Sequence, residues 1–311
     1  MISVLMSVYN ESLSDIKMAV DSILEQTFAD FEFIIVLDNP HYVEAKDYLQ
    51  KCQENDARIK LIFNQENIGL AMSMNKAASI AQGEYLLRMD ADDISVPERF
   101  TIQIQAIAEG DYDLVCSDYD FIDENGQALN NKTTVYTNKQ IEKSLPYRNV
   151  IHHPTVIMKT DTFKRLGGYR NYQCAQDYDL WLRMLLENCT FHMINEKLLH
   201  YRVRQSSTTI KHRYKQVCTR NYILSLWKKK MQGYSYEGYL EYLNKHKATD
   251  ATRQQEYEKY ALLYSDSKKK IKKGNVFGGF FGIMKVLFCS KYYRPHILRN
   301  TGVHFITKFI K

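Results

Sequence analysis

Three aspartates within four positions are the clearest chemical signal in this 311-residue chain. Asp90, Asp92 and Asp93 directly follow an apolar run at residues 85–89 that has the composition of a buried strand. Open α/β sheets bind ligands at the carboxyl ends of their strands. Carboxylates this close together repel one another unless a cation or a set of donors neutralises them, and hard oxygen ligands favour Mg²⁺ or Mn²⁺. A helix start at residues 93–98 would explain one aspartate, but not three.

The hydrophobic pattern before these aspartates predicts a doubly wound α/β domain. Apolar segments typical of buried strands occupy Ile2–Val8, Phe31–Leu37, Ile59–Phe63 and residues 85–89. A helical pattern follows each of the first three strands, and Ser12 or Ser14 is placed to cap the first helix. This alternation is typical of a mostly parallel sheet that is covered by helices on both faces.

Polar side chains also follow two other strands of this predicted sheet. Tyr9 and Glu11 come after the first strand, and Asp38 comes after the second. A single aspartate at a strand end is usually a turn former. Because the carboxyl ends of parallel strands meet at one edge, we expect these residues to line a nucleotide pocket together with the aspartates.

The composition suits a cytosolic protein with one large and one smaller domain. Apolar residues make up 45% of the chain, which is enough for a substantial core. The six cysteines are scattered without a CxxC pair, which is typical of reduced thiols and argues against a zinc site. The N-terminus lacks the basic segment of a signal peptide, and no run reaches the roughly 18 apolar residues of a membrane span.

Charge divides the chain into two unequal parts. Residues 1–204 carry 20 basic and 30 acidic residues, whereas residues 205–311 carry 22 and 6. Such a basic region is expected to meet an anionic partner, either a membrane surface or a nucleic acid. Helical patterns occur there at residues 214–231, 251–273 and Val276–Cys289. The last run is too short to span a bilayer, so it either packs in a core or lies at a membrane interface.

Several short motifs in order resemble glycosyltransferase family 2, a large group of nucleotide-sugar-dependent enzymes with the GT-A fold. They lie at residues 7–11, 22–28, 33–38, 67–70 with Asn75, and 90–93, the last being the DxD motif. The resemblance implies a GT-A domain, with a mixed and mostly parallel sheet, over residues 1–210. Its nucleotide-sugar half would span about residues 1–110 and its acceptor half about 111–210, followed by a basic, all-helical region at 211–311.

The resemblance also implies roles for individual residues of the donor site. The residues expected to bind the nucleotide sugar are Ser7, Tyr9, Glu11, Asp38, Asn67, Gly69, Asp90 and Arg204. Asp90 would contact the ribose or a phosphate, and Asp92 would ligate Mn²⁺ or Mg²⁺, with Asp93 as a further candidate. Leu37 stands where the first of two aspartates is usual, but Asp38 keeps the position credited with uracil contact.

Arg204 is a second departure from the family pattern. It lies in the segment 200–207, which resembles the YRxHxxS motif that closes over the diphosphate, at the position where histidine is usual. A guanidinium cannot ligate a metal ion, but it can neutralise phosphate oxygens directly.

A helix beginning near residue 176 carries the expected general base. Asp177 and Asp179 both fall in its first turn, where a carboxylate is also a common helix-end residue. The resemblance assigns the base to Asp177 and leaves Asp179 one step away on the helix surface. Gln176 replaces the usual preceding glutamate and is a candidate for acceptor contact. His153 is a further candidate near the acceptor side.

These features predict a metal-dependent, inverting glycosyltransferase that moves a hexosyl or N-acetylhexosaminyl group from a UDP-sugar to a hydroxyl of a growing bacterial glycan. The acceptor is expected to be a lipid-linked capsule, exopolysaccharide or lipopolysaccharide glycan at the inner face of the membrane. One alternative is a nucleic-acid-binding protein that uses the basic region, although no RNA- or DNA-binding motif is present. Another is a metal-dependent nucleotidyltransferase, although residues 7–11 lack its usual glycine-rich phosphate loop.

Overall fold

The chain forms two compact units. The computed structural model describes residues 1–130, 132–204, 213–290 and 292–310. The first unit consists of Met1–Glu142 and Val150–Arg204, and the second of Lys143–Asn149 and Gln205–Lys311. The sequence places a single boundary near residue 210, and it gives no sign that Lys143–Asn149 belongs to the C-terminal unit.

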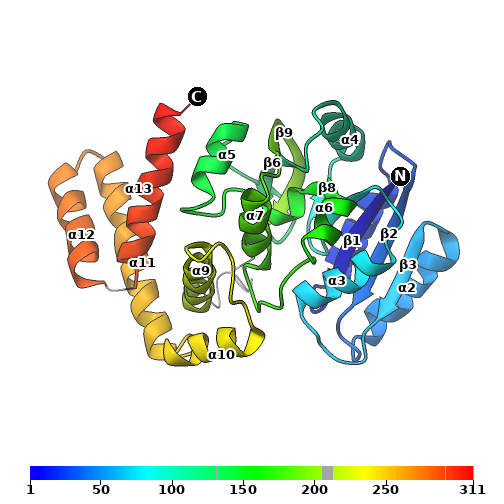
Figure 1. The fold of residues 1–311 in the computed structure, drawn as a ribbon, viewed down its shortest axis with the longest axis horizontal. Helices are drawn as coiled ribbons and strands as arrows, with labels where there is room; N and C mark the ends of the chain where they lie inside the picture. Colours follow the sequence, from blue (N-terminus) through cyan, green and yellow to red (C-terminus); the bar gives the residue numbers. More distant parts are fainter. Residues whose placement is uncertain (131, 205–212, 291, 311) are drawn as a thin grey trace. The chain divides into compact units, whose positions relative to one another are not determined.

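The first unit is built on one mixed sheet (Figure 1). Within the described residues its strands are β1 (Ile2–Val8), β2 (Phe31–Leu37), β3 (Ile59–Phe63), β4 (Tyr85–Asp90), β5 (Ile94–Ser95), β6 (Leu114–Ile122), β7 (Ala128–Leu129), β8 (Ile157–Lys159) and β9 (Phe191–Arg202). They lie in the order β3-β2-β1-β4-β8-β6-β9-β5, with β7 paired to β6. The pairs β1–β2, β1–β4 and β2–β3 are all parallel, as predicted. The predicted α/β fold class is therefore confirmed.

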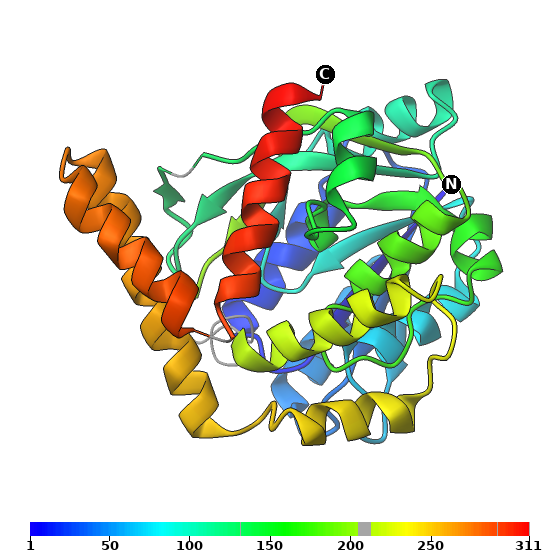
Figure 2. The same cartoon turned by 60° about the vertical axis from the view of Figure 1, so that its left-hand side comes forward.

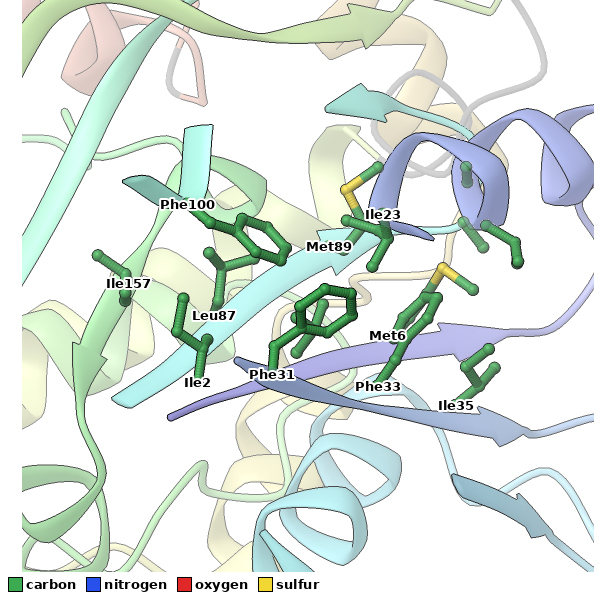
Figure 3. Packing of buried hydrophobic residues seen from close by; sticks show 14 of the residues in the cluster. Ile2, Met6, Ile23, Phe31, Phe33, Ile35, Leu87, Met89, Phe100 and Ile157 are labelled. Atoms are coloured by element: carbon green, nitrogen blue, oxygen red, sulfur yellow. The ribbon is translucent and has the colours of Figure 1, made fainter. Parts of the chain in front are cut away.

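Helices cover both faces of this sheet. The helices of the first unit are α1 (Leu13–Leu24), α2 (Val43–Asn55), α3 (Leu70–Ile80), α4 (Arg99–Glu109), α6 (Thr160–Arg165) and α7 (Gln176–Leu186), with a 3₁₀ turn, η1, at His153–Thr155, whereas α5 (Asn138–Ser144) continues into the second unit. Ser12 caps α1 by accepting a hydrogen bond from the Asp15 backbone N–H. On one face, buried side chains of α1, α2 and α4 pack on β1, β2 and β4, which Figure 3 shows around Met6, Phe33 and Leu87. Helix α3 packs against β1 and β2 outside this cluster, and so covers the opposite face.

The long strand β9 is not indicated by the sequence. Exposed residues at positions 195–197, including Glu196 and Lys197, interrupt its apolar pattern, because this part borders a bulge in its pairing with β6. Strand β6 likewise continues to Ile122, although Asp118 and Asp120 lie within it. Pairing with β9 holds this stretch extended, so the ladder rather than local composition decides its structure.

The C-terminal unit is helical, as predicted. Its helices are α9 (Arg213–Trp227), α10 (Tyr236–Lys245), α11 (Ala251–Lys272), α12 (Val276–Cys289) and α13 (Arg294–Phe309). Helices α9, α11 and α12 occupy the three segments with a helical pattern, whereas α10 and α13 were not expected as separate helices. Helices α11 and α12 form a hairpin that is visible in Figure 2. None of the described helices is long and apolar enough to cross a bilayer.

Glu32 links three strands at the amino edge of the sheet. Its carboxylate accepts hydrogen bonds from the Ser3 hydroxyl of β1 and, at 2.6 Å, from the Gln82 backbone N–H that precedes β4. The Lys60 ammonium of β3 lies 2.6 Å away. Burial alone would raise the pKa of Glu32, but these hydrogen bonds outweigh it and hold the pKa below its ordinary value.

This arrangement makes the stability of the first unit dependent on pH. Because the pKa of Glu32 is lower in the folded state, its stabilisation is present above the unfolded-state pKa and is lost as the pH falls through the folded-state pKa. Glu32→Gln is expected to lower the free energy of unfolding by about 1–3 kcal/mol at pH 7 and to flatten its decline between about pH 5 and pH 3. Urea unfolding across this range measures both effects.

The exposed Glu54 on α2 provides the control. Glu54→Gln should leave both the stability at pH 7 and the acid slope within about 0.5 kcal/mol of the wild type. An identical acid slope in the wild type and Glu32→Gln would mean that Glu32 does not contribute to acid sensitivity.

Candidate active site

The carboxyl ends of β1, β2 and β4 meet at one edge of the sheet. Here the chain leaves β1 towards β2 on one side and leaves β4 towards β6 on the other. In the register of the sheet, Ser7 of β1 lies opposite Asp90 of β4, and Val8 lies opposite Leu37 of β2. A crevice of this kind is where open α/β sheets bind ligands. Ser7 and Asp90 are therefore brought together here, with Glu11 close enough to Asp90 for its charge to be felt.

Several carboxylates share this edge and affect one another. Burial raises the pKa of Glu11, and the charge of Asp90 adds to the increase. Burial also raises the pKa of Asp92 to about 7, with further contributions in the same direction from Asp90, Glu11 and Asp15. Asp15, in the first turn of α1, was not anticipated as a member of this group. The site therefore carries a concentration of negative charge that a bound cation would relieve.

Three arginines partly balance this charge. The Arg88 guanidinium pairs with Asp90 two positions along the same strand. The Arg204 guanidinium lies 2.8 Å from one oxygen of Asp15 and 3.3 Å from an oxygen of Asp92. Arg204, predicted from its place in the sequence, is thus in contact with the acidic group. Arg88 could have been found from the two-residue period of a strand, which puts it on the same face as Asp90.

Arg202, the third of these arginines, fixes the position of the loop that follows β4. Its Nε lies 3.2 Å from a carboxylate oxygen of Asp15 and donates a hydrogen bond to the Asp92 carbonyl. Its backbone N–H donates a hydrogen bond of 2.9 Å to Asp93. Asp93 is fully buried, and burial raises its pKa well above the ordinary value. Asp93 therefore lies beneath the surface of the site, whereas Asp92 is partly exposed.

The chemistry of these residues fits a divalent ion that is shared with a diphosphate. Mg²⁺ and Mn²⁺ are often held by one or two carboxylates, the rest of their ligands being phosphate oxygens and water. Asp92 and its neighbour Asp90 supply such carboxylates. Across residues 1–130, 132–204, 213–290 and 292–310, no three His, Cys, Asp or Glu side chains are grouped so that they could hold an ion by themselves.

Asp38 shapes the neighbouring loop. Its carboxylate is buried and accepts hydrogen bonds from the Asn64 side chain at 2.7 Å and from the backbone N–H groups of Ile68 and Gly69 at 2.9 Å. The exposed Asn67 also accepts from the Gly69 N–H, which closes a tight turn at a glycine with φ of +82°. Asp38, Asn67 and Gly69 thus form one structure. Contact of Asp38 with uracil stays a prediction.

Tyr9 lies at the rim of the site. Its side chain is 42% exposed, and its backbone N–H donates a hydrogen bond of 2.7 Å to Glu11. The carbonyl of Tyr9 accepts a hydrogen bond from the Asn39 side chain, which joins the ends of β1 and β2. An exposed aromatic ring beside a polar crevice is well placed to stack on a base.

Asp177 lies in the first turn of α7, and Tyr169 connects it electrostatically to the acidic edge. The pKa of the Tyr169 hydroxyl is raised mainly by burial and also by the charges of Asp177 and Asp90. This hydroxyl forms a hydrogen bond of 2.8 Å with His153 Nε2. Burial keeps the pKa of His153 well below its ordinary value, so the ring is neutral. His153 therefore fixes the Tyr169 hydroxyl, whose pKa is affected by the charge of Asp177.

Asn75 joins the two halves of the unit through Tyr169. Its side-chain amide N–H donates a hydrogen bond of 2.7 Å to the Tyr169 carbonyl. Its side-chain oxygen accepts a hydrogen bond of 2.8 Å from the Tyr169 backbone N–H. The preceding Gly168 has φ of +67°, and a Cβ there would lie 2.6 Å from the Asn75 oxygen. Helix α3 is thereby tied to the segment that leads to Asp177.

Asp179 does not lie on the helix surface as expected. It is fully buried, with its carboxylate 2.8 Å from Arg183 Nε and 3.3 Å from Arg170 Nη1. The Arg183 guanidinium also donates to the Leu166 and Gly168 carbonyls. The error arises because both faces of the N-terminal part of α7 are covered, and Gln176 is likewise buried. Asp179 is therefore a structural residue, whereas Asp177 is only partly buried.

An aromatic group beside the acidic edge was missed in the sequence. Tyr119 stacks on His152 with ring centroids 4.1 Å apart, and Tyr201 meets His152 edge-on at 4.4 Å. Phe121 contacts both tyrosines. The pKa of Tyr201 is raised by burial and by Asp93, Asp90 and Asp92, so these rings adjoin the aspartates. Burial lowers the pKa of His152 to about 4, and its buried Nε2 has no hydrogen-bond partner in the described part of the chain.

Comparisons with known proteins agree with this geometry. The family model described as Glycosyl transferase family 2 matches residues 3–166. The uncharacterized glycosyltransferase MJ1057 of Methanocaldococcus jannaschii is 37% identical over 233 residues, covering 74% of this chain and 80% of that protein. The O-antigen biosynthesis glycosyltransferase WbnJ of Escherichia coli is 36% identical over 211 residues, covering 67% of this chain and 82% of that protein.

A more distant relative and a solved structure extend the comparison. UDP-Gal:alpha-D-GlcNAc-diphosphoundecaprenol beta-1,3-galactosyltransferase of E. coli is 28% identical over 213 residues, covering 68% of this chain and 76% of that protein. The crystal structure of S. aureus TarS 1–349 in complex with UDP-GlcNAc has a TM-score of 0.56 at 18% identity, and covers 72% of this chain and 66% of that one. The structural likeness shows the fold, and the family match extends over more than half of the sequence. The chain therefore belongs to glycosyltransferase family 2.

Proposed function

We propose that this glycosyltransferase transfers a sugar from a UDP-sugar to a hydroxyl group of a bacterial surface glycan, with inversion at the anomeric carbon. The observation that carries the proposal is the group of Glu11, Asp90 and Asp92 at the carboxyl edge of the parallel strands, with Arg204 beside it. The UDP-GlcNAc complex of TarS, a protein of the same fold, supports UDP as the nucleotide.

The donor is held, on this proposal, by residues of three strand ends. Tyr9 and the loop shaped by Asp38 are placed to contact the nucleoside, and Asp90 lies near the ribose and phosphates. Asp92 would hold Mn²⁺ or Mg²⁺, and Asp90 is its nearest candidate partner. An ion held there would stabilise the negative charge that develops on the leaving diphosphate. The Arg204 guanidinium adds a second positive charge for the same oxygens.

Asp177 serves as the general base. As the acceptor oxygen forms its bond to the anomeric carbon, the bond from that carbon to the diphosphate breaks and UDP leaves with the electron pair. The proton of the attacking hydroxyl passes to the Asp177 carboxylate. The Tyr169 hydroxyl lies close enough to Asp177 to be affected by its charge, and Tyr169 is itself fixed by hydrogen bonds to His153 and Asn75.

The acceptor side is formed in part by the aromatic group of Tyr119, Phe121, His152 and Tyr201. Sugar rings pack their C–H faces on aromatic rings, and these rings adjoin the aspartates that would hold the donor. The proposed donor is a UDP-sugar that carries a hexosyl or N-acetylhexosaminyl group. The proposed acceptor is a lipid-linked glycan. The relative that acts on a diphosphoundecaprenol-linked sugar supports this acceptor class. An enzyme with such an acceptor works at the membrane surface.

Asp92→Asn tests the metal-binding role, because it preserves shape and removes the charge. The variant is expected to lose Mn²⁺-dependent hydrolysis and transfer of the UDP-sugar by on the order of 10²-fold or more, while circular dichroism stays unchanged. Turnover with a panel of UDP-sugars, with and without EDTA, measures the effect.

The matched control is Asp47→Asn, an exposed carboxylate on α2. It should retain wild-type turnover. Turnover by Asp92→Asn within a few-fold of the wild type would remove Asp92 as a metal ligand. Binding of CTP or of single-stranded nucleic acid in preference to UDP would instead favour a nucleotidyltransferase or a nucleic-acid-binding protein.

Asp177→Asn tests the base. This variant is expected to bind UDP with unchanged affinity but to transfer sugar on the order of 10²-fold more slowly, because the proton has no acceptor. Calorimetric UDP titration and a transfer assay separate the two properties.

Two other carboxylates make the comparison specific. Asp161→Asn changes an exposed residue in the first turn of α6 and should leave transfer unaffected. Asp179→Asn breaks buried ion pairs and should instead lower stability, by about 3–5 kcal/mol. Wild-type transfer by Asp177→Asn would show that another group accepts the proton.

A further inference from the structure

Helix α12 presents its large apolar side chains to solvent. Phe277, Phe281 and Phe288 are 91%, 75% and 76% exposed, and Phe280 is 59% exposed. Positions 277, 280, 281 and 288 fall within one face of a helix of 3.6 residues per turn. A contiguous exposed surface of phenylalanines is unusual for a protein that stays in water and marks an interaction site.

The opposite face of α12 packs on its neighbour through glycines. Gly279, Gly282 and Val286 are the buried residues of the helix. A Cβ at Gly279 would lie 2.5 Å from the Ser267 carbonyl oxygen of α11, and one at Gly282 would lie 2.1 Å from the Ser267 hydroxyl. The close approach of α11 and α12 therefore depends on these glycines. The helix is packed through its smallest residues, and its largest ones remain free for another partner.

Basic residues adjoin this phenylalanine face. Lys268, Lys269, Lys270, Lys272 and Lys273 end helix α11, directly before the turn into α12, and Lys285 is exposed on α12. Residues 205–311 contain 22 basic and only 6 acidic residues. If two copies of the chain associated through this face, the basic residues of one copy would lie against those of the other. Their repulsion disfavours self-association.

We propose that α12 lies on an anionic lipid surface, with its phenylalanine face among the acyl chains and the neighbouring lysines on lipid phosphates. The helix has 14 residues, which is too short to cross a bilayer but sufficient to lie in its interface. Helix α12 lies on the side of α11 away from α9 (Figure 1). The choice of a membrane rests in part on the proposed function, since a lipid-linked acceptor requires one.

Vesicle co-sedimentation of the full chain tests the proposal. Phosphatidylcholine vesicles with and without phosphatidylglycerol are used at low and high salt. The wild type is expected to prefer the anionic vesicles and to bind them more weakly at high salt. A triple variant with Phe277→Gln, Phe281→Gln and Phe288→Gln should bind at least about tenfold more weakly at both salt concentrations, because its apolar contact is lost.

Two further variants separate charge from apolar contact. Replacement of the five lysines of α11 and its C-cap by glutamine should weaken binding at low salt and leave binding at high salt nearly unchanged. Val43→Gln with Leu262→Gln, both exposed apolar positions outside α12, should bind as the wild type does. Glutamine has a higher helix propensity than phenylalanine, so α12 is retained in the triple variant.

Three results would overturn the inference. They are equal vesicle binding by the wild type and the triple phenylalanine variant, no preference of the wild type for anionic vesicles, and a wild-type dimer that the triple variant abolishes in light scattering. Calorimetric UDP binding by the same variants is expected to stay unchanged. Vesicle binding without UDP binding would contradict only the proposed function, whereas UDP binding without vesicle binding would contradict only this inference.

Discussion

Mutual repulsion among carboxylates is the constraint on which the site depends. Four carboxylates lie together near the ends of parallel strands: Glu11, Asp15, Asp90 and Asp92. Because these side chains are largely buried, their negative charges are unfavourable unless a positive charge lies nearby. Arginines from β4 and from the end of β9 offset part of this cost. The stability of this edge and the proposed binding of a cation therefore depend on the same electrostatic balance.

The sheet places these charges, and the loops then refine their positions. The register that sets Ser7 opposite Asp90 comes from apolar strands buried along their whole length, and it cannot slip without exposing a core face. Asp38 and Asn75 use side-chain hydrogen bonds to hold backbone in irregular segments. Polar residues of the family motifs thus have a structural task in this chain, and a variant at either position is expected to disturb the local backbone.

The first four strands were predictable because their apolar runs are continuous, and the bounds of β1, β2 and β3 match the predicted segments. Asp90, Asp92 and Arg204 could be grouped because each lies in a motif that the family resemblance assigns to the donor site. Strand β9 was not predictable, since Glu196 and Lys197 break its pattern and its pairing with β6 is a long-range interaction. The burial of Asp179 was missed for a similar reason, as its partner Arg170 lies outside the helix.

The segment Lys143–Asn149 has a consequence for how such chains can diverge. It belongs to the C-terminal unit, where Arg148 donates a hydrogen bond of 3.2 Å to Asn300 and a Cβ at Gly302 would touch Tyr147 at 3.2 Å. Yet it lies inside the stretch that matches the family model. The helical region is therefore no detachable module. A recombination event after residue 204 would deliver α13 without the residues that contact its Asn300 and Gly302, so these contacts persist only when the two pieces are inherited together.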